Sequence, residues 1–436
     1  MPKNDKSDMK MITVVGGGAA GLAAAISAAR ITGGAQVRII EKNDKVGRKL
    51  LATGNGRCNF TNKLCTYQDF VQSSGRESGV PCTDKSFVSK ALSLFGIRET
   101  LQFFEEIGVM PREEDEGRMY PYSEQAAAVQ EALKAETEAL GVEIIYEKSV
   151  RSVRYNSDHR FVLELDDGQL LSTHNVILAS GGKAGIQYGS AGEGYQMARA
   201  FDHTINKPIP ALVPLLSDDP LLKSLKGVRV KGKVTLINDN KKAESKPEEG
   251  EIQFTGEGIS GICVFNLSRY LRLEEPEDRY QDFVIRVDLL PEFTLEALTG
   301  QLTQRRKNLK NRKKEDFLNG MIQSKLALAV YCKSEIDLSG KVENLTDGQV
   351  QKISDTLKGW DIVLSGTKGW KEAQVTSGGV EPSEIDQNTM ESKLVKGLYF
   401  AGELIDVDSK CGGYNLQWAW TSGTIAGKAA AGQEKR

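Results

Sequence analysis

The feature that most constrains the fold is a glycine-rich turn between an apolar strand and a helix. Residues 10–15 form an apolar run that predicts a buried strand, and the sequence Gly-Gly-Gly-Ala-Ala-Gly follows at 16–21. Residues 22–30 are rich in Ala and predict a helix, and the apolar run 37–40 predicts a second strand that ends at Glu41. This order of strand, glycine turn, helix, strand and acid predicts a βαβ unit that binds a dinucleotide.

Each residue type in this unit has a physical reason for its place. Gly16 permits the tight turn, Gly18 lets the backbone approach a pyrophosphate, and Gly21 lets the helix pack closely on the strand. The pyrophosphate meets the free N–H groups and the positive dipole end of the helix. Glu41 can accept hydrogen bonds from ribose hydroxyls, and a carboxylate there disfavours a 2′-phosphate. The predicted cofactor-binding residues of this unit are Gly16, Gly18, Ala19, Ala20, Gly21, Glu41 and Lys42.

The 44 glycines are concentrated at the start, in the middle and at the end of the chain. Glycine is needed where the backbone turns with positive φ or lies close to a ligand. Three distant segments are therefore expected to meet around one large ligand. Because the chain contains only one dinucleotide fingerprint, a nicotinamide donor, if used, has no Rossmann domain of its own.

A second glycine-rich block carries three cations beside the sequence Thr-Gly-Asn-Gly at 53–56. Positive charge there would compensate a pyrophosphate dianion. An ordinary basic surface loop is the alternative. Because a free Cys is most often a small buried hydrophobe, no redox role is expected of Cys58. The predicted cofactor contacts of this block are Arg48, Lys49, Gly56, Arg57 and Cys58.

The middle glycine block follows a third predicted strand. Residues 175–179 are apolar and run into Ser180-Gly181-Gly182, and the sequence Gly-Ser-Ala-Gly-Glu-Gly at 189–194 opens another helix. Ser180, Gly181 and Gly182 are predicted to contact the cofactor. Just before this block, residues 142–146 and 161–165 are expected to pair as antiparallel strands, and Asp-Asp-Gly at 166–168 is a hairpin signal.

The last block combines a buried strand with a helix entry. Residues 397–402 predict a strand that ends near Glu403 and Asp406, and a carboxylate there suits hydroxyl groups of a ligand. Gly-Gly at 412–413 opens a helix predicted over 418–431, whose N-terminal N–H groups suit an electron-rich edge of a ligand. The predicted cofactor contacts of this block are Gly402, Glu403, Asp406, Gly413, Tyr414, Asn415 and Leu416.

Together these blocks resemble the BaiN-like (HI-type) family of bacterial FAD-dependent oxidoreductases, which includes a bile-acid-associated flavin reductase and an aminoacetone oxidase. The resemblance covers essentially the whole chain. It implies an α/β fold with a Rossmann-like, fumarate-reductase-type FAD-binding domain (1–200 and 375–436), an inserted β-barrel-like domain (201–293) and a helical subdomain (294–374). It also implies non-covalent FAD, a backbone contact from Val150 to adenine and a contact of the Asp406 carboxylate with ribityl hydroxyls. Positive charge near flavin N1 would stabilise the reduced anion. The N-terminal N–H groups of the last predicted helix would meet the flavin edge that becomes negative on reduction.

Candidates for chemistry on the substrate lie outside these blocks. The segment 116–123 reads Glu-Gly-Arg-Met-Tyr-Pro-Tyr-Ser and predicts a loop. Arg118 and Tyr120 are the predicted catalytic residues, for substrate orientation or proton delivery. Ser123 has the alternative role of N-cap for the helix predicted over 124–140.

A basic run at 305–314 holds seven Lys or Arg residues in ten. Contact with RNA or DNA is one interpretation. A solvated helix face is the favoured one, because two acids follow at 315 and 316, no aromatic residues are interleaved, and the net charge of the chain is −2.

Composition excludes several classes of protein. The six cysteines form no C-x-x-C pair and none lies near the three histidines, so zinc and iron–sulfur sites are not expected. No run of eighteen apolar residues predicts a membrane helix. Residues 1–10 are polar and lack the apolar core of a signal peptide, so a cytoplasmic location is expected.

The predicted function is therefore that of an FAD-dependent oxidoreductase acting on a small molecule. The favoured chemistry is NAD(P)H-linked reduction of an activated C=C bond in a steroid or bile-acid-like enone, in a pocket shaped by the inserted domain. Oxidation of an amine or aminoketone with O₂ is one alternative. An RNA-associated flavoprotein acting in tRNA modification, with 305–314 on phosphate, and a non-catalytic FAD scaffold are the others.

Overall fold

The computed structural model describes residues 10–72, 86–156, 158, 160–238, 243, 245–271 and 280–432. They form two compact units. The first combines the chain up to Pro210 with the chain from Gln374 onward, and the second is Ala211–Ala373. This division does not test the predicted boundary at 294 between the two parts of the insert, which stays a prediction.

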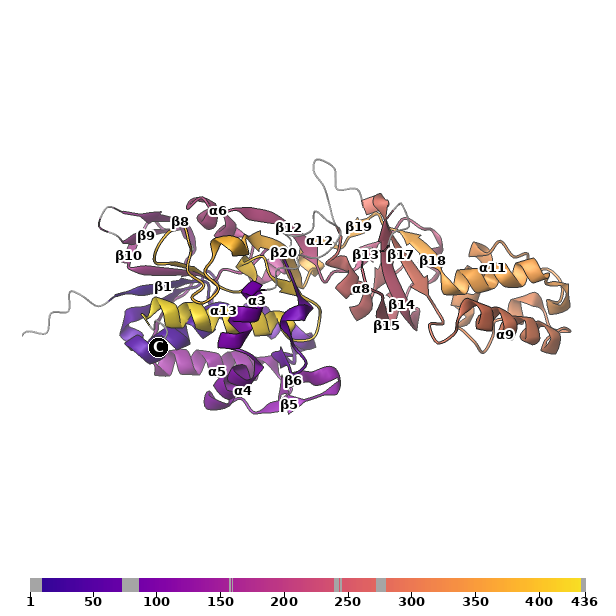
Figure 1. The fold of residues 1–436 in the computed structure, drawn as a ribbon, viewed down its shortest axis with the longest axis horizontal. Coiled ribbons are helices and arrows are strands. Elements are labelled where there is room, and N and C mark those ends of the chain that lie inside the picture. The colour runs from indigo at the N-terminus through magenta and orange to yellow at the C-terminus, as the bar shows by residue number, and fades with distance from the viewer. Residues whose placement is uncertain are drawn as a thin grey trace, which may run out of the picture. The chain divides into compact units, whose positions relative to one another are not determined.

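A five-stranded parallel sheet is the centre of the first unit (Figure 1). Its order is β21-β11-β1-β2-β7, and every neighbouring pair is parallel. The carboxyl ends of parallel strands meet at one edge of the sheet, where nucleotides bind in such folds. The predicted Rossmann-type architecture is confirmed. The strands are β1 Ile12–Val15, β2 Val37–Ile40, β7 Glu143–Ile145, β11 Asn175–Leu178 and β21 Leu398–Phe400.

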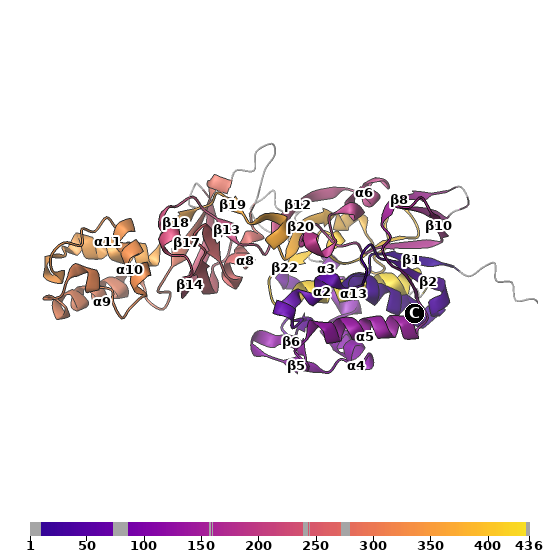
Figure 2. The same cartoon turned by 180° about the vertical axis from the view of Figure 1, so that it is seen from behind.

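Two helices pack against each other beside this sheet: α1 (Ala19–Thr32) and α13 (Tyr414–Ala430). Small residues make the contact close, since a Cβ on Gly423 would lie 2.3 Å from the Ala20 carbonyl oxygen and one on Gly427 would lie 2.1 Å from that of Ala24. The C-terminal helix therefore packs tightly on α1. Figures 1 and 2 show α13 running through the first unit.

The start of α13 differs from the prediction by four residues. The helix begins at Tyr414 instead of residue 418, because Gly413 adopts φ +94° and stands as its N-cap. The backbone therefore enters the helix directly from the glycine pair. This places the backbone N–H groups of residues 414–416 in the first turn, where a helix lacks intrahelical acceptors for them.

The predicted pairing of 142–146 with 161–165 is wrong. β7 is an edge strand of the parallel sheet, in register with β2 so that Ile145 lies opposite Ile40. The antiparallel ribbon instead consists of β8 (Val150–Tyr155), β9 (Phe161–Leu165) and β10 (Leu170–Thr173). A short half-buried strand alternates in the same way in parallel and antiparallel sheets, so its pattern could not decide the partner.

Smaller elements complete the first unit. The segment predicted as a loop at 116–123 contains strand β6, which lies between β3 and β5 in an antiparallel sheet. Helix α5 begins at Ala126, so Ser123 is not its N-cap. The remaining elements are β3 Thr61–Asn62, β4 Phe70–Val71, β5 Pro111–Glu113, β6 Arg118–Pro121, β12 Ile205–Ala211, β20 Val375–Val380, β22 Asp408–Ser409, α2 Arg48–Leu51, α3 Ser86–Leu94, α4 Ile97–Glu106, α5 Ala126–Ala139 and α6 Glu193–Arg199.

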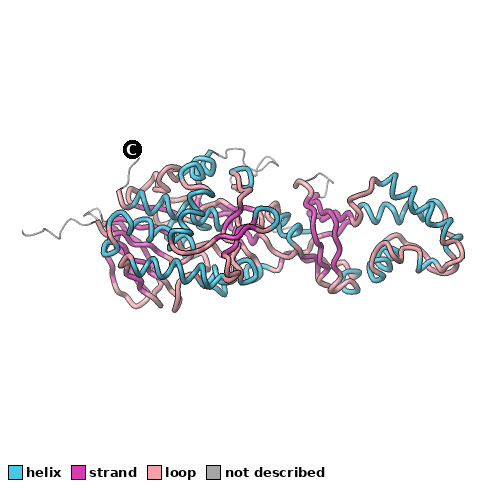
Figure 3. Tube along the Cα trace, turned by 90° about the horizontal axis from the view of Figure 1, so that it is seen from below, coloured by secondary structure: helices cyan, strands magenta, loops and turns pink. Residues whose placement is uncertain are grey.

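The second unit contains a seven-stranded sheet of order β18-β17-β14-β15-β16-β13-β19. No pairing joins β18 to β19 among the described residues, so the expected barrel is an open sheet here. Figure 3 shows the strands and the longer helices gathered in separate parts of this unit. Its elements are β13 Leu215–Leu216, β14 Arg229–Asn238, β15 Glu248–Phe254, β16 Gly258–Ser260, β17 Phe283–Asp288, β18 Trp360–Val363, β19 Gly366–Thr367, α7 Leu221–Ser224, α8 Ile262–Ser268, α9 Leu295–Asn308, α10 Ser324–Lys333, α11 Asp347–Lys358 and α12 Gly369–Glu372.

Among the described helices, none combines the length and the apolar character that crossing a membrane requires.

Candidate functional site

Two glycines of the first turn serve packing. Gly16 has φ +104°, and a Cβ on it would lie 2.6 Å from the Ala179 carbonyl oxygen at the end of β11. A Cβ on Gly21 would lie 1.9 Å from the Gly16 carbonyl oxygen. Both positions therefore exclude any side chain, and they hold the turn against the neighbouring strand.

Gly18 is different. Its backbone is extended, with φ −79°, and it is the N-cap of α1 without a side-chain cap. A Cβ on Gly18 would meet nothing within 4 Å. No contact within the protein requires glycine here, so the helix N-terminus is left open for a ligand. A phosphate group suits this place, because the first N–H groups of α1 and the helix dipole favour an anion.

The turn after β11 adds an unsatisfied group. The Ser180 hydroxyl oxygen is buried and has no hydrogen-bond partner within the described part of the chain. A buried polar atom without a partner is rare in a folded protein, and a bound ligand is one of the usual reasons. Since Ser180 Cα would lie 2.9 Å from a Cβ on Gly16, the two turns are neighbours. Their combination fits the phosphate part of a dinucleotide such as FAD.

Glu41 is fixed at the end of β2. One of its carboxylate oxygens accepts a hydrogen bond from the Gly17 N–H at 2.8 Å. The other accepts from both the backbone N–H and the side-chain amide of Asn43, at 2.8 and 2.7 Å. A carboxylate has about four acceptor positions, so about one remains for a ribose hydroxyl.

Asn43 was missed by the sequence reasoning. Its amide oxygen accepts a hydrogen bond from the Arg48 guanidinium at 2.9 Å, so it positions one of the predicted cations. An Asn two residues after the acid that ends a strand is a turn-forming pattern, and this signal could have identified it.

Ion pairs join blocks that are far apart in the sequence. Lys42 pairs with Glu193 at the start of α6. Lys49 pairs with Glu403 at 2.6 Å, and the other oxygen of Glu403 accepts from the Thr376 N–H at 2.6 Å. The first, middle and last glycine blocks therefore meet in one place, as predicted.

Thr376, on β20, is a second residue that sequence reasoning missed. Its hydroxyl accepts hydrogen bonds from the Lys183 and Ala184 N–H groups at 2.8 and 3.0 Å, and so holds the chain that follows the middle block. A Cβ on Gly182 would lie 2.3 Å from the same hydroxyl. No motif contains Thr376, because its role depends only on where β20 returns to the first unit.

Arg57 lies with the candidate catalytic residues. Its guanidinium is 4.2 Å from the centre of the Tyr120 ring and forms ion pairs with Glu114 and Glu124. These contacts engage part of the charge that was predicted to compensate the pyrophosphate, and the contact of Arg57 with the cofactor stays a prediction. Arg48 and Lys49 remain beside the glycine turns.

Tyr120 and Arg118 are neighbours on β6. Tyr120 is 8% exposed, and burial raises the pKa of its phenol. The phenol therefore stays protonated at neutral pH. Arg118 forms an ion pair with Glu116 and lies opposite Asn62 of β3 in the sheet register. Because the Asn62 amide donates a hydrogen bond to the Gly412 carbonyl at 3.0 Å, β3 connects this strand to the entry of α13.

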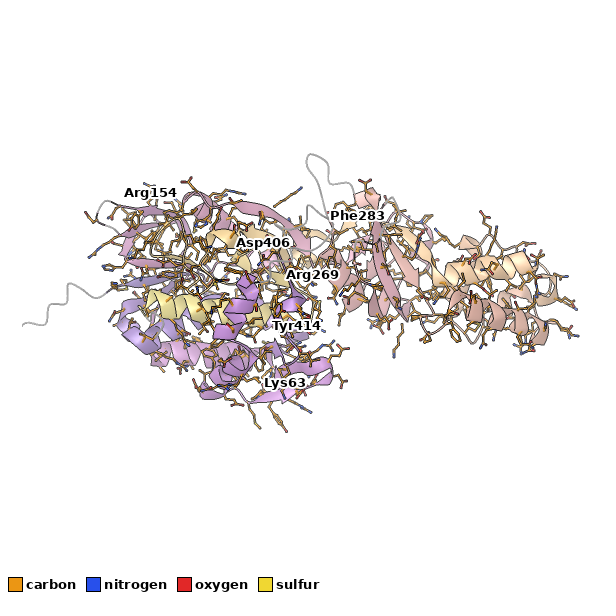
Figure 4. The ribbon with its side chains drawn as sticks, viewed as in Figure 1. Lys63, Arg154, Arg269, Phe283, Asp406 and Tyr414 are labelled. Atoms are coloured by element: carbon orange, nitrogen blue, oxygen red, sulfur yellow. The ribbon has the colours of Figure 1, made fainter. Side chains whose placement is uncertain are left out.

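The entry of α13 is held by its own side chains. The Asn415 amide donates to the Ser409 carbonyl and accepts from the Ser409 N–H, both at 2.8 Å. Lys410 lies 4.9 Å from the centre of the Tyr414 ring, and Figure 4 shows Tyr414 at this end of the helix. Leu416 is half-buried in the first turn. The helix N-terminus is therefore a fixed element, suited to an electron-rich ligand edge.

Two predicted cofactor contacts, Cys58 and Asp406, are fully buried. Cys58 is fully buried, and burial raises the pKa of its thiol to about 12. Asp406 is also fully buried, with its two oxygens accepting from the Asn206 amide at 2.7 Å and from the Gly378 N–H at 3.1 Å. Asp406 therefore holds β12 and β20 together, and its contact with ribityl hydroxyls stays a prediction.

Val150 begins β8 and is 7% exposed. The segment just before it runs beside Glu41, since the Lys148 N–H donates to the Glu41 carbonyl at 3.1 Å. The structure therefore brings the predicted adenine contact and the predicted ribose contact into one region.

Comparison with known proteins places the chain among relatives of nearly equal length. The model of the HI0933-like protein Rossmann domain matches residues 10–429. A 3-dehydro-bile acid delta(4,6)-reductase of Clostridium scindens is 38% identical, over 97% of this chain and 99% of its own. A ribosomal RNA dihydrouridine synthase of Haemophilus influenzae is 30% identical, over 94% and 95%.

A solved structure supports the fold. The 3-ketosteroid delta1-dehydrogenase of Sterolibacterium denitrificans superposes with a TM-score of 0.50 at 13% identity, over 98% of this chain and 100% of its own. At this identity the likeness concerns the arrangement of the backbone alone.

Proposed function

Because the chain belongs to the HI0933-like Rossmann-domain family and is an FAD-binding oxidoreductase, we propose that it reduces a C=C bond conjugated to a carbonyl group. The electron donor is NAD(P)H, and the first candidate substrate is a steroid-like enone. The observation that carries this proposal is the 38% identity, over almost the full length of both chains, to a reductase of a 3-dehydro-bile acid.

The residues placed to hold FAD come from all three glycine blocks. The N-terminus of α1 at Gly18 and the turn at Ser180 suit the diphosphate, and Glu41 suits a ribose. The N-terminus of α13 suits the flavin edge that gains negative charge on reduction. When bound, FAD supplies hydride transfer, and the protein supplies orientation and electrostatics.

Reduction of an enone also requires a proton. We assign it to the Tyr120 phenol, whose raised pKa keeps the hydroxyl protonated at neutral pH. The Arg57 guanidinium over the ring fixes the orientation of this side chain. General acids of this kind contribute roughly 10²- to 10⁴-fold to a rate.

Anaerobic photometry of the purified, FAD-loaded protein tests the donor and the reaction. NADH or NADPH alone should bleach the flavin absorbance, and a 3-keto-4-ene steroid should restore it with one saturated product per flavin. Bleaching by an amine or aminoketone alone would instead support the alternative oxidase chemistry. Protein reduced by NAD(P)H that no conjugated enone can reoxidise would refute the proposal.

A uracil base in ribosomal RNA is a second candidate substrate. The observation in its favour is the 30% identity to a ribosomal RNA dihydrouridine synthase over 94% of this chain. Uracil has a C5=C6 bond conjugated to a carbonyl, so its reduction belongs to the same reaction class as that of an enone. Nucleoside mass spectrometry of ribosomal RNA from a deletion strain tests it, because loss of one dihydrouridine, restored by the intact gene, is the expected result.

A further inference from the structure

An open groove lies between two helices of the second unit. Helices α9 and α11 lie side by side and pack on each other (Figures 1 and 2). The groove is lined mainly by one face of α9 and by Gln351 of α11. The positively charged run 305–314 forms the C-terminal end of α9 and the loop after it.

Some of the basic residues serve the fold. Arg305 donates to the Phe317 carbonyl at 2.5 Å, and Arg306 donates to the Leu345 carbonyl at 2.7 Å. Lys314 is 6% exposed and donates to a backbone carbonyl at 3.1 Å. For these three residues the predicted solvated face is wrong, because they connect α9 to the neighbouring segments.

Lys307, Lys310 and Arg312 do not connect α9 to its neighbouring segments in this way. All three are exposed, and none has an ion pair within 4 Å among the residues that the structure describes. The backbone that carries two of them is held, since the Lys310 carbonyl accepts from Glu343 at 3.2 Å and the Arg312 carbonyl accepts from Val342 at 2.9 Å. The three charges are therefore displayed from a fixed backbone.

The groove itself contains an unexplained glycine. Gly300 lies in the middle of α9, and a Cβ on it would meet nothing within 4 Å. Glycine weakens a helix interior relative to Ala, and no packing contact compensates for it here. The absence of a side chain leaves room for a ligand to approach the helix closely.

Hydroxyl groups flank this open position. Thr299 and Thr303 each donate their hydroxyl hydrogen to a backbone carbonyl one turn earlier, at 2.9 and 2.8 Å. Their oxygens keep free lone pairs and can accept hydrogen bonds. The lining residues include Lys307 at the basic end and no aromatic side chain on which a base could stack. They also include Glu296, but this carboxylate lies in the first turn of α9, about three turns from Lys307, so phosphates are expected at the Lys307 end.

We propose that this surface binds the backbone of RNA. It is called the α9 groove and consists of Thr299, Gly300, Thr303 and Lys307 of the groove lining, together with Lys310 and Arg312 of the loop that follows α9. The cations pair with phosphates, the threonine oxygens accept from ribose 2′-hydroxyls, and Gly300 lets the sugar–phosphate chain approach. Without aromatic side chains the groove positions RNA but does not read its bases. This inference rests on the second substrate candidate and deepens it.

The test measures binding of the FAD-loaded full chain to a fluorescein-labelled, single-stranded 30-nucleotide RNA at several salt concentrations. Reversing the three charges (Lys307→Glu, Lys310→Glu, Arg312→Glu) should weaken binding at least about 30-fold and lower the slope of log K against log salt by about 2, since each phosphate contact on a single strand contributes about 0.7. Lys223→Glu, Lys226→Glu and Lys396→Glu, which reverse three exposed lysines outside the groove, form the control with the same net charge.

A second variant tests the groove without changing charge. Gly300→Leu should weaken RNA binding several-fold while the helix is retained, because Leu favours a helix and its side chain occupies open space. Equal RNA affinity of the groove and control variants, or no RNA binding by the parent at low salt, would overturn the inference. Dihydrouridine formation in ribosomal RNA is assayed separately, so failure of the second substrate candidate and failure of RNA docking at the α9 groove give different results.

Discussion

Gly18 offers the sharpest test of where the cofactor lies. The position is extended and open, so Gly18→Val introduces neither strain nor a clash. Loss of unfolded-state entropy stabilises such a substitution by about 0.4–1 kcal/mol, and a poorer N-cap costs about as much. The free energy of unfolding of the apo protein should therefore change by less than about 1 kcal/mol.

The effect on FAD should be much larger. A side chain at Gly18 occupies the space in front of the α1 N-terminus and separates the phosphate from two or more N–H groups. Hydrogen bonds to charged groups contribute roughly 1.5–3 kcal/mol each, so the loss is roughly 3–6 kcal/mol. At about 1.4 kcal/mol for each factor of ten, the Kd for FAD should rise roughly 10²- to 10⁴-fold.

The assay compares flavin content per chain, the Kd for added FAD and the urea midpoint of the apo protein. Gly21→Ala is the matched control, because its Cβ would lie 1.9 Å from the Gly16 carbonyl oxygen. That variant should lose stability and flavin together, whereas Gly18→Val should lose flavin alone. A folded Gly18→Val protein that binds FAD within threefold of the parent would refute the placement of the diphosphate.

Three further predictions concern catalysis, pH and packing. Tyr120→Phe should lower the rate of enone reduction roughly 10²- to 10⁴-fold at unchanged flavin content, whereas the control Tyr122→Phe, at a residue that is 59% exposed, should leave the rate unchanged. Equal rates for Tyr120→Phe and the parent would exclude the phenol as the proton donor. His203 is buried, and burial lowers its pKa below 6.5. Because the unfolded chain then binds more protons than the folded one, thermal stability should fall as pH drops below about 6.5, and the stability of a His203→Gln variant should depend less on pH. Gly427→Ala places a Cβ 2.1 Å from a backbone oxygen of α1 and should lower the free energy of urea unfolding by about 3 kcal/mol or more. The control Gly348→Ala in α11, where the nearest neighbour of the new Cβ is at 3.9 Å, should instead raise it by roughly 1 kcal/mol.

Local sequence was sufficient for the elements whose signal is local. The first βαβ unit was predicted with its turn and its acid, because the spacing of Gly16, Gly18, Gly21 and Glu41 is itself the requirement for nucleotide binding. The last helix packs closely because Gly427 stands where a side chain would not fit, and only the structure shows that Ala24 of α1 fills that space.

Partners in space were not predictable in the same way. The strand at Glu143–Ile145 has the same alternation in either orientation, and only its place beside β2 makes it parallel. Asp406 and Arg57 have the residue types that a cofactor requires, but their charges are engaged by Asn206 and Glu114, which lie far from them in the sequence.

The sequence by itself determined the fold class, the nucleotide turn and the glycine blocks that meet at one edge of the sheet, because glycine spacing and strand periodicity are written in consecutive residues. Tertiary structure alone decided which acids and cations remain available to a ligand, and it alone showed that Gly18 and Gly300 are open where Gly16 and Gly21 are filled. The physical reason is that a charge is paired, and a space is filled, only by groups that folding brings close together.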